Sequence, residues 1–313
     1  MHEEVSFPEL AEVIPQIAVL LGAQEGAVRP LDGGITNRNF RAMFGGGDYV
    51  VRLPGKDTNL LGIDREAERI ANQRAAELGL APEVAATLHK PTCLVTRFVA
   101  GHEMTPSELR RPETVAQVAR ALRQFHASGL KLPTDFQVLD IARDYAGVVR
   151  DRGKEPPRAF EEALERAREV VMAVRDDPDH TPVPCHNDLL PANFLCGDGG
   201  RIAIVDWEYA GMGDRFFDLG NLAVNNEFED EDQDRLLKVY FGEPPTARRR
   251  ASLKLFRFMS DFREAMWGVV QSSVSDLDFD FEAYAAKHFT RMSATSGDAR
   301  FDALLEEVRG GPA

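Results

Sequence analysis

One short segment, "PCHNDLLPANFL" at residues 184–195, carries a dense set of polar side chains that could do chemistry. His186, Asp188 and Asn193 fit the spacing H-x-D-x-x-x-x-N, which is typical of kinase catalytic loops. In such a loop the aspartate accepts or orients the proton of an acceptor hydroxyl, and the asparagine offers Mg²⁺ a hard carbonyl oxygen. We therefore predict Asp188 as the catalytic base and Asn193 as a metal ligand. An H-x-D also occurs by chance, so a polar surface loop stays open as an alternative.

A second segment, "IAIVDWEYAG" at residues 202–211, follows shortly after Asn193. Its β-branched run predicts a strand that ends at Asp206, which would deliver a carboxylate beside the loop. A strand-end aspartate after the catalytic loop is the Mg²⁺ ligand of kinases. Glu208 is predicted to assist the metal; a hydrogen-bonded acid that faces solvent is an equally open interpretation.

Two further residues are predicted to hold the loop rather than to react. His186 is expected to fasten loop backbone, since histidines in this motif usually do so. Asp218, in "RFFDLGN" at residues 215–221, lies between apolar neighbours at the start of a predicted helix. A half-buried aspartate there is expected to bond backbone amides of the catalytic loop.

Upstream, "LDGGITNRNF" at residues 31–40 joins two predicted strands through a glycine turn. Glycines let backbone N–H groups approach phosphates closely, and small hydroxyl or amide side chains can add hydrogen bonds. An ordinary glycine hairpin is the alternative interpretation. The residues predicted to bind nucleotide phosphates here are Gly33, Gly34, Thr36 and Asn37.

The next strand, "YVVRLPG" at residues 49–55, carries Arg52, a cation that could reach the α- and β-phosphates of a nucleotide. Glu66, in the first turn of the following helix, is predicted to pair with Arg52. Its alternative role is compensation of the helix dipole. The order of parts favours phosphoryl transfer: glycine loop, strand cation, helix glutamate, H-x-D loop, strand aspartate.

The elements that must position these residues fall into two groups. Three antiparallel strands within 28–55, a helix at 64–79 and strands at 83–89 and 93–99 predict a small β-rich lobe, residues 1–99. Beyond Gly101 the pattern becomes helical, which predicts a larger lobe, residues 100–313, with a ligand cleft between the two. The elements expected in the larger lobe are helices at 112–129, 157–177, 215–226, 230–241, 247–274 and 279–293, and a short strand at 201–207.

Composition excludes several classes of function. The 313 residues carry a net charge of −14, and the pI is near 5.0, which argues against nucleic-acid binding and against an anionic membrane surface. An acidic chain is compatible with a small cationic substrate. The three cysteines lack disulfide or zinc spacing, the acidic N-terminus does not resemble a signal peptide, and no apolar stretch reaches membrane-span length. These features predict a cytoplasmic protein.

The stretches "GGITNRNFR", "VVRLPG", "HNDLLPANFL" and "VDWEYAGMGDRFFDLGN" together resemble the choline/ethanolamine kinase family, within the aminoglycoside-phosphotransferase-like branch of the protein-kinase-like fold. The resemblance covers about residues 28 to 290. It implies an α+β bilobal fold, ATP and Mg²⁺ as cosubstrates, and a small hydroxyl acceptor. It also implies Asp188 as base, Asn193 and Asp206 as metal ligands, and adenine bonding to the hinge backbone near Arg97, Phe98 and Val99.

The family holds its cationic acceptor with aromatic rings from the last helices, and residues 262–289 align with that region by eye. Trp267 and Tyr284 fall at cage-like positions, although Trp267 is equally compatible with a core residue. Glu264 stands where animal choline kinases tend to have a further aromatic. A carboxylate there could bond the N–H donors of a primary ammonium, which trimethylammonium lacks, so an ethanolamine-like acceptor is open beside choline. Glu264 could instead point to water.

Other acceptors are compatible with the same chemistry, namely thiamine, an aminoglycoside or a sugar. A non-catalytic nucleotide-binding protein is the alternative from a different class. That alternative predicts the loss of Asp188, Asn193 or Asp206, and all three are present.

Overall fold

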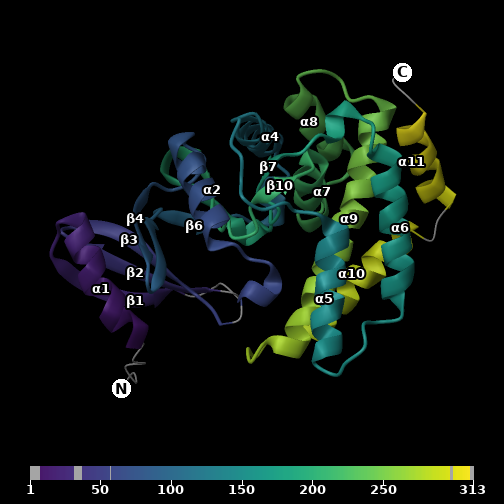
Figure 1. The fold of residues 1–313 in the computed structure, drawn as a ribbon. Helices are drawn as coiled ribbons and strands as arrows, with labels where there is room; N and C mark the ends of the chain where they lie inside the picture. The colour runs from purple at the N-terminus through teal and green to yellow at the C-terminus, as the bar shows by residue number, and fades with distance from the viewer. Residues whose placement is uncertain (1–7, 32–36, 57, 297–298, 311–313) are drawn as a thin grey trace.

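The computed structural model describes residues 8–31, 37–56, 58–296 and 299–310. A small lobe built on a five-stranded antiparallel sheet, in the order β1-β2-β3-β5-β4, lies beside a larger helical lobe (Figure 1). This arrangement confirms the α+β bilobal fold. The small-lobe elements are α1 (Pro8–Leu21), β1 (Glu25–Leu31), β2 (Asn37–Phe44), β3 (Gly47–Pro54), α2 (Arg65–Glu77), β4 (Val84–His89) and β5 (Thr92–Arg97).

The sheet has its own apolar core because β2 and β3 bury alternate residues. Phe40 and Phe44 of β2 and Val51 of β3 pack in a cluster that α1 covers with Val13 and Ile17. A two-residue turn, Gly45–Gly46, joins β2 to β3 with positive φ at both positions, which glycine adopts without steric cost. The three strands predicted for 28–55 are confirmed.

Helix α2 begins as predicted, since the Asp64 side chain accepts hydrogen bonds from the backbone N–H groups of Glu66 and Ala67. Its buried face packs with the core of the larger lobe rather than with the sheet core. The backbone N–H of Ile204 also donates to the carbonyl of Leu80, 2.8 Å away. Residues 61–81 therefore share packing with the larger lobe, and the division into 1–99 and 100–313 stays a prediction.

The larger lobe surrounds one long, mostly buried helix, α9, against which α5, α6, α7, α10 and α11 pack (Figure 1). Sequence analysis predicted α4, α6, α7, α8, α9 and α10 and missed α3, α5 and α11. The helices of this lobe are α3 (Pro106–Leu109), α4 (Pro112–His126), α5 (Val138–Asp151), α6 (Ala159–Val174), α7 (Arg215–Asn225), α8 (Asp230–Phe241), α9 (Ala247–Val274), α10 (Phe281–Ser296) and α11 (Ala299–Arg309).

Two small antiparallel sheets sit between the lobes and hold the predicted catalytic segments. One has the order β6-β8-β9 and the other pairs β10 with β7. The 184–195 segment runs from β7 into β8, and Asp206 follows β9 closely. The strands are β6 (Gly101–Glu103), β7 (Val183–Cys185), β8 (Phe194–Gly197), β9 (Ile202–Ile204) and β10 (Gly211–Gly213). In the part of the chain that the structure describes, no helix has the length and apolar character of a membrane span.

Candidate active site

The catalytic loop is braced by His186, as predicted. The ring is fully buried, with Nε2 2.9 Å from the Val205 carbonyl and Nδ1 3.2 Å from the backbone nitrogen of Asp188. A carbonyl can only accept, so Nε2 donates and Nδ1 accepts from the amide, which defines a neutral ring. Burial lowers the pKa of His186, in agreement with that tautomer. His186 therefore fixes backbone rather than exchanging a proton.

Asp218 accepts hydrogen bonds from the backbone of the same loop, also as predicted. Its Oδ1 accepts from the backbone N–H of Asn187 at 2.7 Å, and its Oδ2 accepts from that of His186 at 2.9 Å. His126 Nε2 donates to Oδ2 at 2.9 Å. Burial alone would raise the pKa of Asp218, but the bond to His126, together with the charges of His126 and His186 and the backbone N–H of His186, outweighs burial and the pKa is lowered. Asn187 has a φ of 67°, a left-handed conformation that asparagine tolerates and that this brace stabilises.

Asp188 occupies the floor of the cleft and is only 7% exposed. Asn193 Nδ2 donates to its Oδ2 at 3.1 Å and to its backbone carbonyl at 2.7 Å. Its Oδ1 lies 3.7 Å from the Arg263 guanidinium. Burial raises the pKa of Asp188 well above its usual range, while Arg263 opposes the rise. A raised pKa makes the carboxylate a better proton acceptor than an exposed aspartate.

Arg52 joins Asp206 to α2, but its helix partner differs from the prediction. Arg52 Nη1 lies 2.8 Å from Glu68 Oε1, and Nη2 lies 2.6 Å from Asp206 Oδ1. The predicted pair with Glu66 is wrong. Two residues along a helix turn the side chain by about 200°, so Glu68 lies on the buried face and Glu66 on the opposite one.

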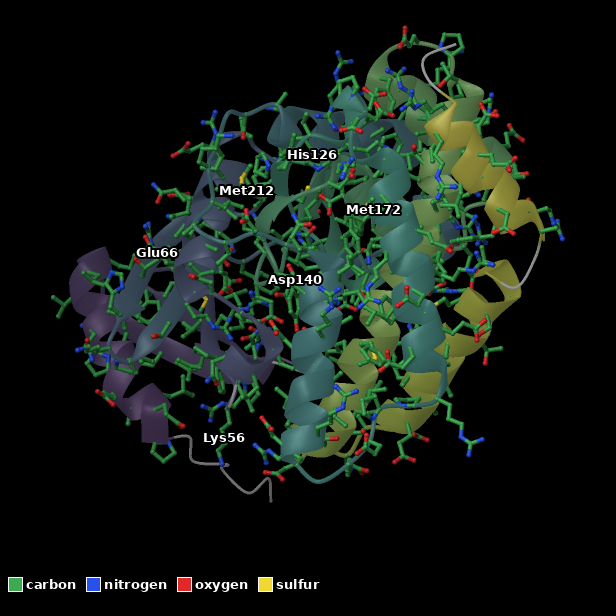
Figure 2. All side chains as sticks on the ribbon, turned by 45° about the vertical axis from the view of Figure 1, so that its right-hand side comes forward. Lys56, Glu66, His126, Asp140, Met172 and Met212 are labelled. Carbon is green, nitrogen blue, oxygen red and sulfur yellow. The ribbon has the colours of Figure 1, made fainter. Side chains whose placement is uncertain are left out.

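Glu66 is half exposed and pairs with Arg69 one helical turn away. Figure 2 labels it on the small-lobe side of the molecule, and it does not line the large cleft that contains Asp188. Of its two interpretations, pairing with Arg52 is wrong, and its place in the first turn of α2 is compatible with compensation of the helix dipole. Glu68 is thus a functional candidate that sequence reasoning missed. The signal was available in the spacing of the small residues Ala67, Ala71 and Ala75, which mark the buried face.

Glu208 is 3% exposed, so the interpretation that it faces solvent is wrong. Its Oε2 accepts from Asn37 Nδ2 at 2.8 Å and lies 3.4 Å from Arg65 Nη1. Asn37 thereby ties the start of β2 to the segment after β9. The other residues predicted to bind phosphates, Gly33, Gly34 and Thr36, lie outside the described residues.

The oxygen donors near Asp188 fit a hard divalent cation. Asn193 Nδ2 points towards Asp188, so the Oδ1 of the same amide is the atom that can bind a ligand. Asp206 Oδ1 is buried beside Arg52, yet it accepts no aligned hydrogen bond among the described residues. Asp206 has a φ of 64°, an uncommon conformation for a residue other than glycine and one that recurs at functional sites. Carboxylate and amide oxygens are the ligands Mg²⁺ prefers.

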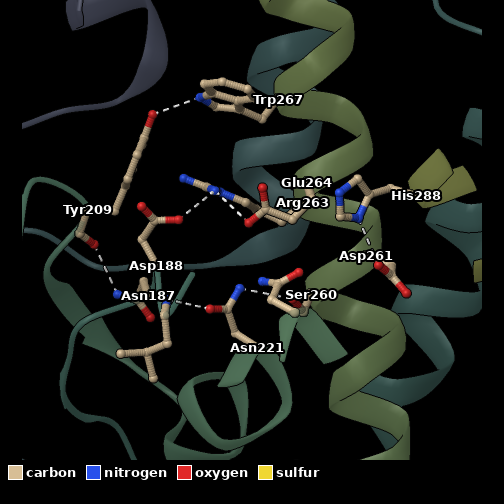
Figure 3. Close-up of polar contacts among 12 residues, drawn as sticks. Asn187, Asp188, Tyr209, Asn221, Ser260, Asp261, Arg263, Glu264, Trp267 and His288 are labelled. Carbon is tan, nitrogen blue, oxygen red and sulfur yellow. Dashed lines mark hydrogen bonds and ion pairs between the residues drawn. The ribbon is translucent and has the colours of Figure 1, made fainter. Parts of the chain in front are cut away.

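The acceptor side of the cleft combines aromatic and charged groups (Figure 3). Trp267 Nε1 donates to the Tyr209 hydroxyl at 2.8 Å, and the Trp267 and Tyr284 rings meet edge to face at 5.4 Å. Glu264 is 1% exposed and does not point to water. Its oxygens accept from Arg263 Nη1 at 2.8 Å and from the Tyr284 hydroxyl at 2.7 Å. Sequence reasoning named Glu264, Trp267 and Tyr284 but missed Tyr209 and Arg263.

One continuous cleft brings most of the predicted residues together. At its hinge end lie Arg97, the last residue of β5, and Phe98 and Val99, which follow that strand. At its far end lie Trp267 and Tyr284. Between these ends the cleft is lined by Arg52, Asp188, Asn193, Asp206, Glu208, Tyr209, Arg263 and Glu264.

Comparison with known proteins agrees with this geometry. The sequence profile of the family described as "Phosphotransferase enzyme family" matches residues 27–253. A solved structure of a choline/ethanolamine kinase family protein from Mesorhizobium loti superposes with a TM-score of 0.80 at 33% identity, covering 96% of this chain and 99% of that one. The chain belongs to the choline/ethanolamine kinase family. As a member it is a small-molecule kinase, a phosphotransferase with an alcohol group as acceptor.

Curated relatives of this kinase cover most of its length. Protein LicA of Haemophilus influenzae is 28% identical over 287 residues, which is 88% of this chain and 79% of that protein. Ethanolamine kinase 2 of Mus musculus is 29% identical over 272 residues, covering 77% of this chain and 68% of that protein. The similarity therefore extends over both lobes of the kinase.

Proposed function

We propose that this kinase transfers the γ-phosphate of ATP to the hydroxyl of a small amino alcohol such as ethanolamine or choline. The proposal rests chiefly on the position of Asp188. Its buried carboxylate lines the same cleft as Arg52 and Asp206, the candidates for phosphate and metal binding, and as the Trp267–Tyr284 pair. The names of the relatives, Ethanolamine kinase 2 among them, support the same class of acceptor.

On the nucleotide side, the adenine lies against the hinge segment that contains Arg97, Phe98 and Val99. Arg52 neutralises phosphate charge and is held in place by Glu68. Asn193 and Asp206 would hold Mg²⁺, and Glu208, which lines the same cleft, would assist. The ion, when bound, neutralises the charge that develops on the transferred phosphoryl group.

On the acceptor side, the hydroxyl lies beside Asp188. The hydroxyl oxygen forms a bond to the γ-phosphorus while the bond from that phosphorus to the β,γ-bridging oxygen breaks, and ADP leaves. The hydroxyl proton passes to the Asp188 carboxylate. The ammonium end of the acceptor rests against Trp267 and Tyr284, whose ring faces attract a cation.

A substrate panel tests the proposal. ADP release is measured with Mg-ATP and each of choline, ethanolamine, their mono- and dimethylated intermediates, thiamine, kanamycin and a hexose. We expect turnover with one or more of the four amino alcohols and little with the others. Turnover confined to thiamine, kanamycin or the sugar would overturn the proposed acceptor and leave the nucleotide assignments standing.

A further inference from the structure

Arg263 is a charged residue sealed inside the acceptor side of the cleft, and the reaction scheme above does not use it. It lies in the buried middle of α9 and is 1% exposed. Its Nη1 lies 2.8 Å from Glu264 Oε1 and 3.7 Å from Asp188 Oδ1. Its guanidinium carbon is 4.0 Å from the centre of the Tyr209 ring. Figure 3 shows the guanidinium among Asp188, Glu264, Trp267 and Tyr209.

Arg263 contacts groups that would otherwise attract a cationic substrate. Both oxygens of Glu264 are occupied, one by Arg263 and one by the Tyr284 hydroxyl. One face of Tyr209 is covered by the guanidinium. Each Glu264 oxygen therefore already has one donor, and burial of the side chain restricts the access of a primary ammonium to the remaining lone pairs. The pocket already contains one positive charge before any substrate enters.

Arg263 stays protonated in the pocket. Burial opposes a cation, but Glu264 and the neighbouring acids raise the pKa of the Arg263 guanidinium well above its ordinary value. Its Nε and Nη2 donate no hydrogen bond within the described part of the chain, so the residue is retained at a cost in desolvation. A hydrophobic residue would fill such a site at lower cost, which points to a functional reason for a cation here.

Arg263 also restrains Asp188. The Asp188 carboxylate has Asn193 on one oxygen and Arg263 on the other, and each comes from a different element of the lobe. Asn193 follows Asp188 in the loop, while Arg263 comes from α9. The guanidinium thus links the reacting carboxylate to the helix that carries Trp267.

We propose that Arg263 is a resident cation of the acceptor pocket, which positions Asp188 and limits how tightly a cationic acceptor binds. This inference rests on the proposed acceptor class. It assigns Arg263 as a positioning and specificity-determining residue, and it assigns Glu264 as the partner that holds Arg263 rather than as a direct ligand of the ammonium.

The test separates charge from shape with two probes, choline and its neutral isostere 3,3-dimethylbutan-1-ol. Their dissociation constants are measured by calorimetry in the presence of Mg²⁺ and a non-hydrolysable ATP analogue. In Arg263→Met we expect the preference for choline over the isostere to rise roughly tenfold, because a like charge is removed from the pocket. The kcat for ethanolamine should fall roughly 10- to 100-fold, because Asp188 loses its restraint.

Matched variants keep the test decisive if Arg263→Met folds poorly. Glu264→Gln leaves the resident cation uncompensated, so the preference for choline over the isostere should fall roughly tenfold. The double variant Arg263→Met/Glu264→Gln removes one charge of each sign and should return that preference close to the wild-type value. Arg263→Lys keeps the charge and should keep the preference, with part of the kcat. Thermal unfolding and ATP affinity verify that each variant is folded.

The two single substitutions must move the preference in opposite directions. An equal change in the binding of choline and isostere, or no change in either folded variant, would overturn the role of Arg263. If the wild-type kinase still phosphorylated ethanolamine in that case, the proposed function would survive. Absence of amino-alcohol turnover in the wild-type kinase would instead overturn the proposed function. If choline also failed to bind every variant, the inference about Arg263 would be overturned as well.

Discussion

Two arginines occupy comparable settings on opposite sides of the cleft, and they differ in one respect. Arg52 lies between Glu68 and Asp206, and Arg263 lies between Glu264 and Asp188. The Arg52 side chain is 12% exposed and the Arg263 side chain 1%. Each arginine contacts two carboxylates. One of them, Glu68 or Glu264, holds the arginine in place, and the other, Asp206 or Asp188, belongs to the reaction centre.

The difference in burial separates two uses of the same ion-pair arrangement. Arg52 Nη2 lies 2.6 Å from Asp206 Oδ1, and both side chains keep some exposure where they line the cleft, so an entering phosphate or metal ion can reach this pair. Arg263 has no comparable access to solvent. Its hydrogen bond to Glu264 is well aligned and buried. We infer that Arg52 serves the ligand that enters, whereas Arg263 shapes the pocket that receives the second ligand.

Removing Arg52 should have the largest effect on the nucleotide side. In Arg52→Met we expect kcat/KM for ATP to fall roughly 100- to 1,000-fold, because a preorganised cation that stabilises phosphate charge is lost. Arg69→Met removes a cation of α2 that faces away from the cleft and should change kcat/KM little. Steady-state kinetics with ATP varied at saturating acceptor measure both. Equal losses of kcat/KM in the two variants would show that the effect comes from the loss of any positive charge and not from the position of Arg52 in the cleft.

The choice between Glu68 and Glu66 sharpens the same comparison. Glu68→Gln should lower kcat/KM for ATP roughly tenfold or more, because Arg52 loses a buried charged partner. Glu66→Gln makes the identical chemical change two residues earlier in the same helix and should leave kcat/KM near the wild-type value. The reverse ranking would restore the pairing expected from the sequence and contradict the structure.

A smaller effect, confined to the other ligand, is expected at the far end of the cleft. Trp267→Ala should raise the KM for the amino alcohol roughly 5- to 30-fold, because one cation-binding ring is lost. The KM for ATP should stay near its wild-type value. Kinetics with each substrate varied in turn give the two constants. An unchanged acceptor KM in a folded variant would make Trp267 a core residue and nothing more.

The residues that could be predicted from the sequence are those fixed by short spacings. His186, Asp188 and Asn193 lie within one loop, and Asp206 follows a recognisable strand, so their grouping needs little tertiary information. The brace by Asp218 was predictable for a different reason: an acid between apolar residues near a helix start must find donors.

What could not be predicted depends on side-chain direction and on distant partners. The alanine spacing of α2 marks its buried face, but it does not say that Arg52, from another element, is the partner of Glu68. The surroundings of Glu264 are set by Tyr284 from α10 and, through Arg263, by Asp188 from the catalytic loop. No local pattern reports such contacts. Helices α5 and α11 were missed although each buries an apolar stripe against the rest of the lobe.

The central claim is that Asp188 takes the proton of the acceptor hydroxyl, and one measurement tests it most directly. Single-turnover phosphoryl transfer to the preferred amino alcohol is compared between the wild-type kinase and Asp188→Asn, with ATP affinity measured in parallel. The account predicts a rate lower by roughly 100- to 10,000-fold with ATP affinity nearly unchanged. A variant that keeps most of its rate while binding ATP normally would contradict the assignment of Asp188.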